Sequence, residues 1–327
     1  MTRKIRLIVA VVLVCAVVLS ACGGGGGSTQ LLNMGTGTTG GTYFALGGAM
    51  ATTWGNNIDG LSVTPVATGA SVENLNMLNS GEVALGLAMN NVADAAWYGN
   101  FPFDTAERNF RAIGVIYPEI LQVVATQASG ITSLDDIVGA RVAIGPPGSG
   151  TAVVTEQLLQ VMGFDVSSDI SAVSSGFGDA SALMQDGHLD VSFAVLGVPA
   201  SAIVELEIST PLNFLSVSDA LLADLQVVHP YFDRHVIPAG TYSNTEDIHV
   251  IYCQAVLYVR YDLDEEMVYQ LTRVFFMNSD ETAAAHAMGA QINLDNALNG
   301  ITTPVHLGAV RFFESVGITV PANLIID

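Results

Sequence analysis

Two segments within residues 31–88 resemble two segments within residues 141–194, in the same order. Residues 31–41 (LLNMGTGTTGG) and 141–151 (RVAIGPPGSGT) are each a short apolar run that breaks into a glycine-rich loop before a helix-like stretch. Residues 71–88 align with residues 177–194 at a similar offset. Alternating strand and helix patterns favour a parallel sheet covered by helices, and two copies favour two similar lobes. The alternative is a chance resemblance between two ordinary βαβ units.

The first 22 residues have the pattern of a bacterial lipoprotein signal. Arg3, Lys4 and Arg6 precede an apolar run from residue 7 to residue 19, and small residues lead to Cys22. A membrane-spanning helix needs about 20 apolar residues, so this run is short for a transmembrane anchor, which is the alternative.

We therefore expect a signal peptide over residues 1–21 and a lipid on the sulfur of Cys22. Residues 22–30 are rich in glycine and would form a flexible tether. The lipid would hold the mature chain to a membrane, in the periplasm or elsewhere outside the cytoplasm.

The charge of the chain argues against nucleic acid as a partner. The formal net charge is −21, and loss of the three basic residues of the leader would make it about −24. The mature chain has seven arginines and no lysine. A field this negative repels phosphate backbones.

The cysteines offer no disulfide framework. Cys15 lies in the leader, Cys22 is the expected lipidation site, and Cys253 stands alone in an apolar run. We expect Cys253 to be a small buried hydrophobe rather than a reactive thiol.

Four loops are candidates for the functional site because they follow predicted strands. Open α/β sheets bind ligands beyond the carboxyl ends of their strands. Each loop is rich in Gly, Ser, Thr or Pro before a predicted helix, so backbone N–H groups and short hydroxyls would face an entering anion. The alternative for each loop is that its residues only cap the N-terminus of the following helix and bind no ligand. The loops are residues 35–43, 68–71, 145–151 and 196–199.

Sequence motifs of known enzyme classes are absent or incomplete in this chain. Residues 35–40 (GTGTTG) match the dinucleotide fingerprint, but no acidic residue follows the next strand to hold a ribose. Residues 145–151 have P-loop glycine spacing, yet Thr151 stands where the lysine belongs. No G-x-S-x-G occurs, and the six histidines lack metal-ligand spacing. We expect no enzyme activity, no cofactor and no metal.

Several segments resemble the TAXI family, the TRAP-associated extracytoplasmic immunogenic proteins, which are solute-binding subunits of TRAP transporters. The resemblance covers nearly the whole mature chain. At residues 89–91 the chain has Met-Asn-Asn, where the family commonly has Gln-Ser-Asp. The segments are GTGTTGGTYFALGGAMATTW (35–54), ATGASVENLNMLNSGEVALG (67–86), IYPE (116–119), SLDDIVGARVAIGPPGSGT (133–151), IPAGTY (237–242) and the C-terminal residues 283–313.

The resemblance implies a two-lobed periplasmic-binding-protein fold of the type II clamshell kind. Two hinge strands, near residues 117–126 and 249–260, would join the lobes. Lobe 1 would comprise residues 31–121 and 254–327, and lobe 2 residues 122–253.

The same resemblance implies that the protein captures a small organic anion, such as glutamate, glutamine or a dicarboxylate. It would deliver the anion unchanged to TRAP membrane subunits. Two alternatives stay open: a lipid-anchored ligand sensor of the same fold, and a periplasmic enzyme on this scaffold. The expected ligand-binding residues are Thr38, Thr39, Gly40, Tyr43, Ser71, Asn90, Gly148, Ser149, Gly150, Thr151 and Leu196.

Overall fold

The computed structural model describes residues 29–326. The predicted signal peptide and Cys22 lie outside the described residues. From Leu31 onward the chain forms one compact unit. None of the described helices is both long enough and apolar enough to cross a membrane.

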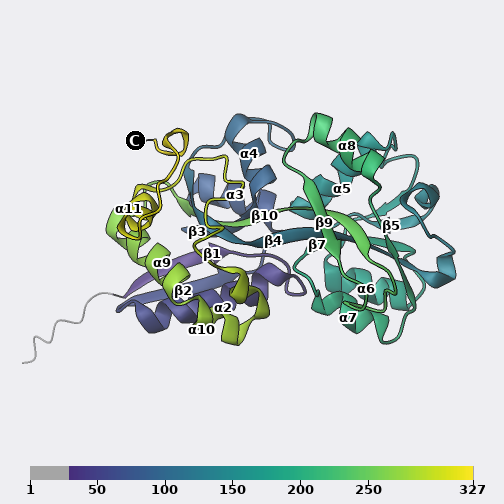
Figure 1. The fold of residues 1–327 in the computed structure, drawn as a ribbon, viewed down its shortest axis with the longest axis horizontal. Helices are drawn as coiled ribbons and strands as arrows, with labels where there is room; N and C mark the ends of the chain where they lie inside the picture. Colours follow the sequence, from purple (N-terminus) through teal and green to yellow (C-terminus); the bar gives the residue numbers. More distant parts are fainter. Residues whose placement is uncertain (1–28, 327) are drawn as a thin grey trace, which may run out of the picture. The chain divides into compact units, whose positions relative to one another are not determined.

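One sheet of ten strands runs through this unit, with strand order β2-β1-β3-β10-β4-β7-β5-β6 (Figure 1). In addition, β8 pairs with β4 and β9 pairs with β10. The strands are β1 Gln30–Gly35, β2 Leu61–Val66, β3 Leu85–Met89, β4 Phe110–Thr126, β5 Arg141–Ala143, β6 Ser171–Val173, β7 Val191–Leu196, β8 Leu212–Leu215, β9 Asp233–Ile237 and β10 Ile248–Arg260.

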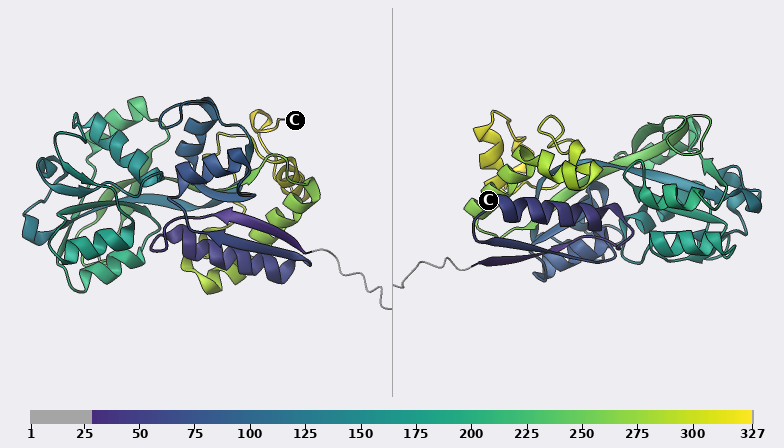
Figure 2. Two further views of the ribbon diagram at one scale, coloured as in Figure 1. Left: turned by 180° about the vertical axis from the view of Figure 1, so that it is seen from behind. Right: turned by 90° about the horizontal axis from the view of Figure 1, so that it is seen from below.

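Helices cover both faces of the sheet (Figures 1 and 2). On one face lie α3, α4, α5 and α8, and on the other lie α2, α6, α7 and α10. The helices are α2 Thr42–Asn57, α3 Ser71–Ser80, α4 Asn90–Tyr98, α5 Gly150–Val161, α6 Phe177–Gln185, α7 Ser201–Glu207, α8 Asp219–Val228, α9 Glu265–Met277, α10 Ser279–Ala285 and α11 Leu307–Ser315.

The internal repeat appears as two units of the same topology. The first unit has strands in the order β2-β1-β3 and the second in the order β6-β5-β7, and the central strand pairs in parallel with β3 or β7. This confirms the predicted two-lobed α/β fold. The first lobe contains β1 to β3 with α2 to α4 and α9 to α11, and the second contains β5 to β9 with α5 to α8.

The long antiparallel strands β4 and β10 belong to both lobes. Residues 255–259 of β10 pair with β3 of the first lobe, and residues 248–252 pair with β9 of the second. Similarly, β4 pairs with β7 from Ile120 onward. The predicted boundaries at 121/122 and 253/254 stay a prediction, because both strands run between the lobes without a break.

Burial explains why these two strands are so apolar. Of the 17 residues of β4, only Arg111 and Pro118 are not fully buried. A strand with helices on both faces needs apolar side chains on both faces, so its sequence does not alternate. Cys253 of β10 is also buried, as expected.

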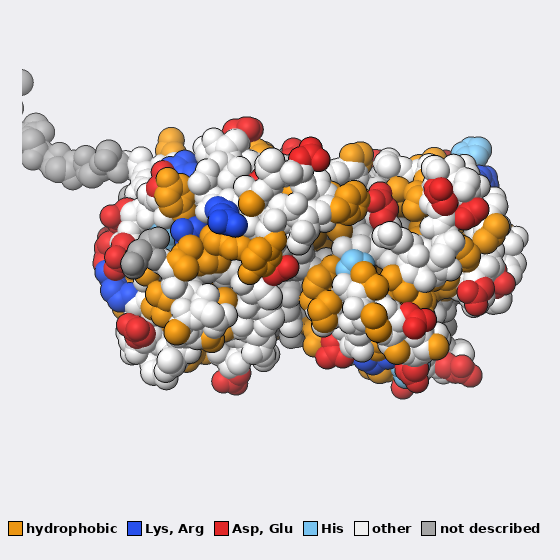
Figure 3. Space-filling view, turned by 90° about the horizontal axis from the view of Figure 1, so that it is seen from above, with side chains coloured by type: hydrophobic (Ala, Val, Ile, Leu, Met, Phe, Trp, Pro, Cys, Tyr) orange, Lys and Arg blue, Asp and Glu red, His pale blue; other side chains and the backbone are white. Residues whose placement is uncertain are grey.

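Acidic side chains are spread over both lobes on the face shown in Figure 3, and basic side chains are few. On this face, residues of α4, α5 and the end of α8 line a hollow of about 690 Å³.

Candidate functional site

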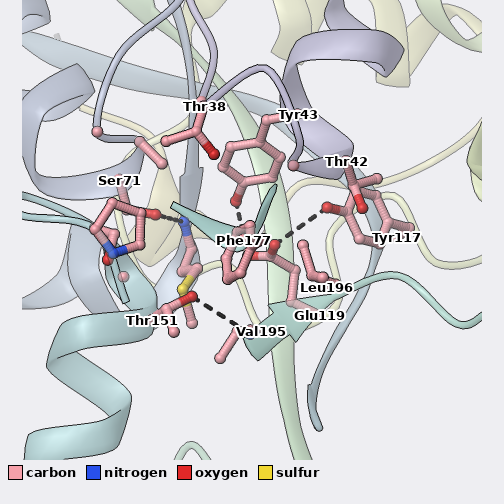
Figure 4. A pocket seen from close by; sticks show the side chains of 18 residues that line it. Thr38, Thr42, Tyr43, Ser71, Tyr117, Glu119, Thr151, Phe177, Val195 and Leu196 are labelled. Atoms are coloured by element: carbon pink, nitrogen blue, oxygen red, sulfur yellow. Dashed lines mark hydrogen bonds between the residues drawn. The ribbon is translucent and has the colours of Figure 1, made fainter. Parts of the chain in front are cut away.

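A small cavity lies where loops of both lobes meet in front of β4 (Figure 4). Its volume is about 30 Å³. Because a single water needs about 10–15 Å³, a solute of amino-acid size enters only if the loops separate. The cavity is lined by Gly37, Thr38, Gly41, Thr42, Tyr43, Gly69, Ala70, Ser71, Met89, Tyr117, Glu119, Pro146, Ser149, Gly150, Thr151, Phe177, Val195 and Leu196.

The structure gathers most of the predicted ligand-binding residues at this cavity. Two others, Thr39 and Gly40, line a neighbouring groove of about 590 Å³ instead. Asn90 and Gly148 line neither space. The predicted residues at the cavity are Thr38, Tyr43, Ser71, Ser149, Gly150, Thr151 and Leu196.

Three hydroxyl groups at the cavity accept hydrogen bonds from backbone N–H groups. Ser71 Oγ accepts from Met89 at 3.1 Å, and Ser149 Oγ accepts from Ala152 at 3.0 Å. Thr151 Oγ1 accepts from Val195 at 3.4 Å. None of the three donates to an acceptor within residues 29–326. A hydroxyl has one donor and two acceptor positions, so each of these O–H groups is available to donate to a solute.

A fourth hydroxyl, that of Thr38, has no partner at all among the described residues, although its Oγ1 is buried. An unpaired buried hydroxyl costs free energy until a partner arrives. Thr38 and the three other hydroxyls therefore offer donors from both lobes.

Four helices begin at or beside the cavity, and three of them lack a side-chain cap. These are α2, α3 and α6, which follow Gly41, Ala70 and Gly176. At α5, Ser149 supplies the cap. Helix N-termini carry partial positive charge and free N–H groups, which favour an anionic group.

The two lobes touch through residues that have no Cβ. The carbonyl oxygen of Gly148 accepts hydrogen bonds from the backbone N–H groups of Val72 and Glu73, at 3.0 and 3.2 Å. This places Gly148 in the contact between lobes, where it caps α3 of the other lobe. A Cβ on Gly69 would stand 2.3 Å from the carbonyl oxygen of Pro147. Only glycine permits an approach this close.

Asn90 has a structural role in this conformation. Its side chain donates to the carbonyl of Gly300 and accepts from the backbone of Gln254. Asn74 behaves similarly nearby, since its amide donates to the carbonyls of Thr36 and Leu87. These two amides hold the loops of the first lobe in place.

The most unusual residue of the cavity is Glu119, on β4. It is 4% exposed, and it is the one buried Asp, Glu, Lys or Arg within residues 29–326. The Tyr43 hydroxyl donates to Oε2 at 2.7 Å and the Tyr117 hydroxyl donates to Oε1 at 3.1 Å (Figure 4). The hydroxyl of Tyr43 is therefore already engaged as a hydrogen-bond donor to Glu119 in this conformation.

Burial raises the pKa of Glu119 to about 7, against the two tyrosine hydrogen bonds, which lower it. Burial and the neighbouring Glu119 also raise the pKa values of Tyr43 and Tyr117 well above their usual range. Near neutral pH, Glu119 thus carries charge in part of the molecules, and both tyrosines stay protonated.

Cations are missing from this site. None of the described lining residues is Lys, Arg or His, and no ion pair within residues 29–326 includes Glu119. In the same range, no group of three or more His, Cys, Asp or Glu side chains is placed to hold a metal ion.

Sequence reasoning identified the loops but missed Glu119, Tyr117 and Phe177 as cavity residues. The IYPE segment was noted only for its resemblance, because Glu119 lies within an apolar run rather than at a strand end. The available signal was the charge itself: a lone carboxylate in a run of buried residues needs a partner.

Comparison with known proteins identifies the family of the chain. The model of the NMT1-like family matches residues 34–317. The chain belongs to the NMT1-like family. This is a family of periplasmic solute-binding proteins, and the homologues found are substrate-binding proteins of transport systems rather than enzymes.

Solved structures share the fold at low sequence identity. A protein of Bordetella bronchiseptica is 15% identical over 89% of this chain and 90% of its own, with a TM-score of 0.51. A substrate-binding protein of an ABC uptake transporter from Streptococcus pneumoniae, with bound histidine, is 11% identical over 80% and 92%, with a TM-score of 0.50. A periplasmic transporter structure is 12% identical over 78% and 82%, also at 0.50. At these identities the likeness concerns the fold alone.

Proposed function

We propose that this chain is the solute-binding subunit of a TRAP-type transporter of the TAXI group. It captures a small organic anion between its lobes and delivers it, unchanged, to membrane subunits. Membership of a solute-binding family and the TAXI-like segments support this proposal.

The observation that carries the proposal is the set of free hydroxyl protons around the cavity. Ser71 comes from the first lobe, and Ser149 and Thr151 come from the second. A carboxylate between them would accept from both lobes and so favour their approach. The helix N-termini at the same place add favourable charge without any arginine.

Capture would require the lobes to separate and close again about β4 and β10. The pairing of the two strands changes register at two points, between Ala255 and Val256 and between Leu257 and Tyr258. These irregularities lie near the crossing between lobes, where a bend can be absorbed.

A thermal-shift screen tests capture directly. The mature protein is heated with each of the common amino acids and with C4 to C6 dicarboxylates. A solute at 100 times its dissociation constant is expected to add about 2.7 kcal/mol to the free energy of unfolding. A flat response across both classes would count against the proposal.

Uptake into proteoliposomes tests the transporter class. With TRAP large and small membrane subunits in the bilayer, the binding protein and its solute should give uptake that depends on an ion gradient and not on ATP. Uptake that depends on ATP with ABC-type membrane subunits would instead assign the chain to an ABC importer, the class of the Streptococcus pneumoniae protein.

A further inference from the structure

The cavity combines two chemically opposite ends. At one end stand hydroxyl donors and the N-termini of α2 and α6, which have no side-chain cap and suit a carboxylate. At the other end Glu119 presents a carboxyl group from β4. A ligand that carried only carboxylates would bind well at the first end and be repelled at the second whenever Glu119 is ionised.

The carboxyl group of Glu119 keeps unused acceptor capacity. Two carboxylate oxygens provide about four lone-pair positions, and Tyr43 and Tyr117 occupy one on each oxygen. Neither partner is a cation, so the ionised form lacks a counter-charge among the described residues. Burial of an unpaired carboxylate costs free energy, and a cation that binds to it offsets this cost.

We infer that the solute is an α-amino acid, whose ammonium group binds Glu119 while its carboxylate binds the hydroxyls of Ser149 and Thr151. This inference rests on the proposed function, and it narrows the proposed class of anions to zwitterions. A simple dicarboxylate is then a poor ligand, since it lacks the ammonium group.

The titratable groups in contact with Glu119 are neutral, so none of them supplies a charge that competes with an ammonium group. Tyr43 of α2 and Tyr117 of β4 are hydrogen-bond donors, and the thiol of Cys253 on β10 contacts the Glu119 backbone carbonyl at 3.9 Å. Burial and the charge of Glu119 raise the pKa values of all three well above their usual range, so they stay neutral between pH 6 and 8. In that interval Glu119 is the group of this cluster that changes charge.

Calorimetric titration with matched pairs of probes tests the inference on the wild-type protein. Each L-amino acid that gives a thermal shift is compared with the same molecule without its amino group, for example L-glutamate with glutarate. Loss of a charged hydrogen bond to a buried partner corresponds to about 10- to 100-fold in affinity. We expect the amino-free compound to bind weaker by at least that factor.

A variant and a pH series separate ligand contact from a structural role. Glu119→Gln should weaken amino-acid binding about 10- to 100-fold and leave the weak binding of the amino-free compound unchanged or stronger. Wild-type affinity for the amino acid should rise about tenfold from pH 6 to pH 8, as Glu119 ionises, and the variant should show no such rise. Equal losses for both probes would show that Glu119 is merely structural.

The outcomes for the two proposals are distinguishable. Tight binding of glutarate or succinate, with no binding of any amino acid, overturns the inference and leaves the solute-binding role standing. Binding of neither class overturns the proposed function, and the inference with it. The comparison of probe pairs needs only wild-type protein, so it decides the matter even if Glu119→Gln does not fold.

Discussion

Replacement of Gly69 by alanine is expected to hold the two lobes apart. The new methyl group would lie 2.3 Å from the carbonyl oxygen of Pro147 in the opposite lobe, whereas ordinary contacts begin near 3.4 Å. That oxygen belongs to the backbone and cannot swing aside. The lobes must therefore recede by roughly 1 Å, which would break the hydrogen bonds that Gly148 accepts from Val72 and Glu73.

The size of the effect follows from those two hydrogen bonds. Each contributes about 0.5–1.5 kcal/mol net, so closure becomes less favourable by about 1–3 kcal/mol. If the solute binds tightly only when the lobes are closed, its affinity falls by about 5- to 150-fold. The free energy of unfolding without solute should change little, because opening relieves the clash.

Calorimetry and small-angle scattering on the same samples measure both consequences. The matched control is Gly178→Ala, beside the cavity, where the added methyl group would meet nothing within 4 Å. Gly69→Ala should lose affinity and stay expanded when saturated with solute, and the control should behave as wild type. Wild-type affinity together with wild-type compaction in Gly69→Ala would refute the idea that these glycines permit closure.

Three further predictions concern single side chains. Because Glu119 has a folded-state pKa of about 7 against 4.5 unfolded, the stability its proton provides is fully present below pH 4.5 and lost as pH rises to 7. Relative to Glu119→Gln, wild-type stability in denaturant should thus fall by about 3 kcal/mol over that interval, and parallel pH curves would contradict this. Ser149→Ala should cost about 1 kcal/mol of stability through the lost α5 cap, and about 10- to 100-fold in affinity if the hydroxyl also binds solute; intact affinity would leave it a cap only. Cys22→Ala should release the protein from the membrane fraction. The wild-type protein should be found in that fraction and carry more than one acyl chain. Soluble wild-type protein without an acyl chain would exclude lipid anchoring.

The sequence predicted the parts of the site that depend on local chain chemistry. The repeat fixed the order of strands and helices in each lobe, and the carboxyl ends of β1, β2, β5 and β7 fixed which loops meet. Serine and threonine at helix starts predicted hydroxyl donors to an anion, with helix N-capping as the alternative. In the structure Ser149 caps α5, and its contact with a solute stays a prediction.

What the sequence could not predict depends on side-chain direction and on distant pairing. Thr39 and Gly40 lie in the right loop but face the neighbouring groove, because successive residues of a tight loop point in different directions. The partner of Glu119, Tyr43, is 76 residues away, and only the folded sheet brings them together. The sequence alone therefore did not predict that Glu119 lines the cavity, or that the cavity could bind an ammonium group.

A crystal structure of the mature protein grown with L-glutamate, or with the amino acid that gives the largest thermal shift, tests the central claim most directly. The account predicts solute density between the lobes, with its carboxylate within hydrogen-bond distance of Ser149 and Thr151 and its ammonium group within hydrogen-bond distance of Glu119. Density confined to one lobe, or lying in the hollow between α4, α5 and α8, would contradict it.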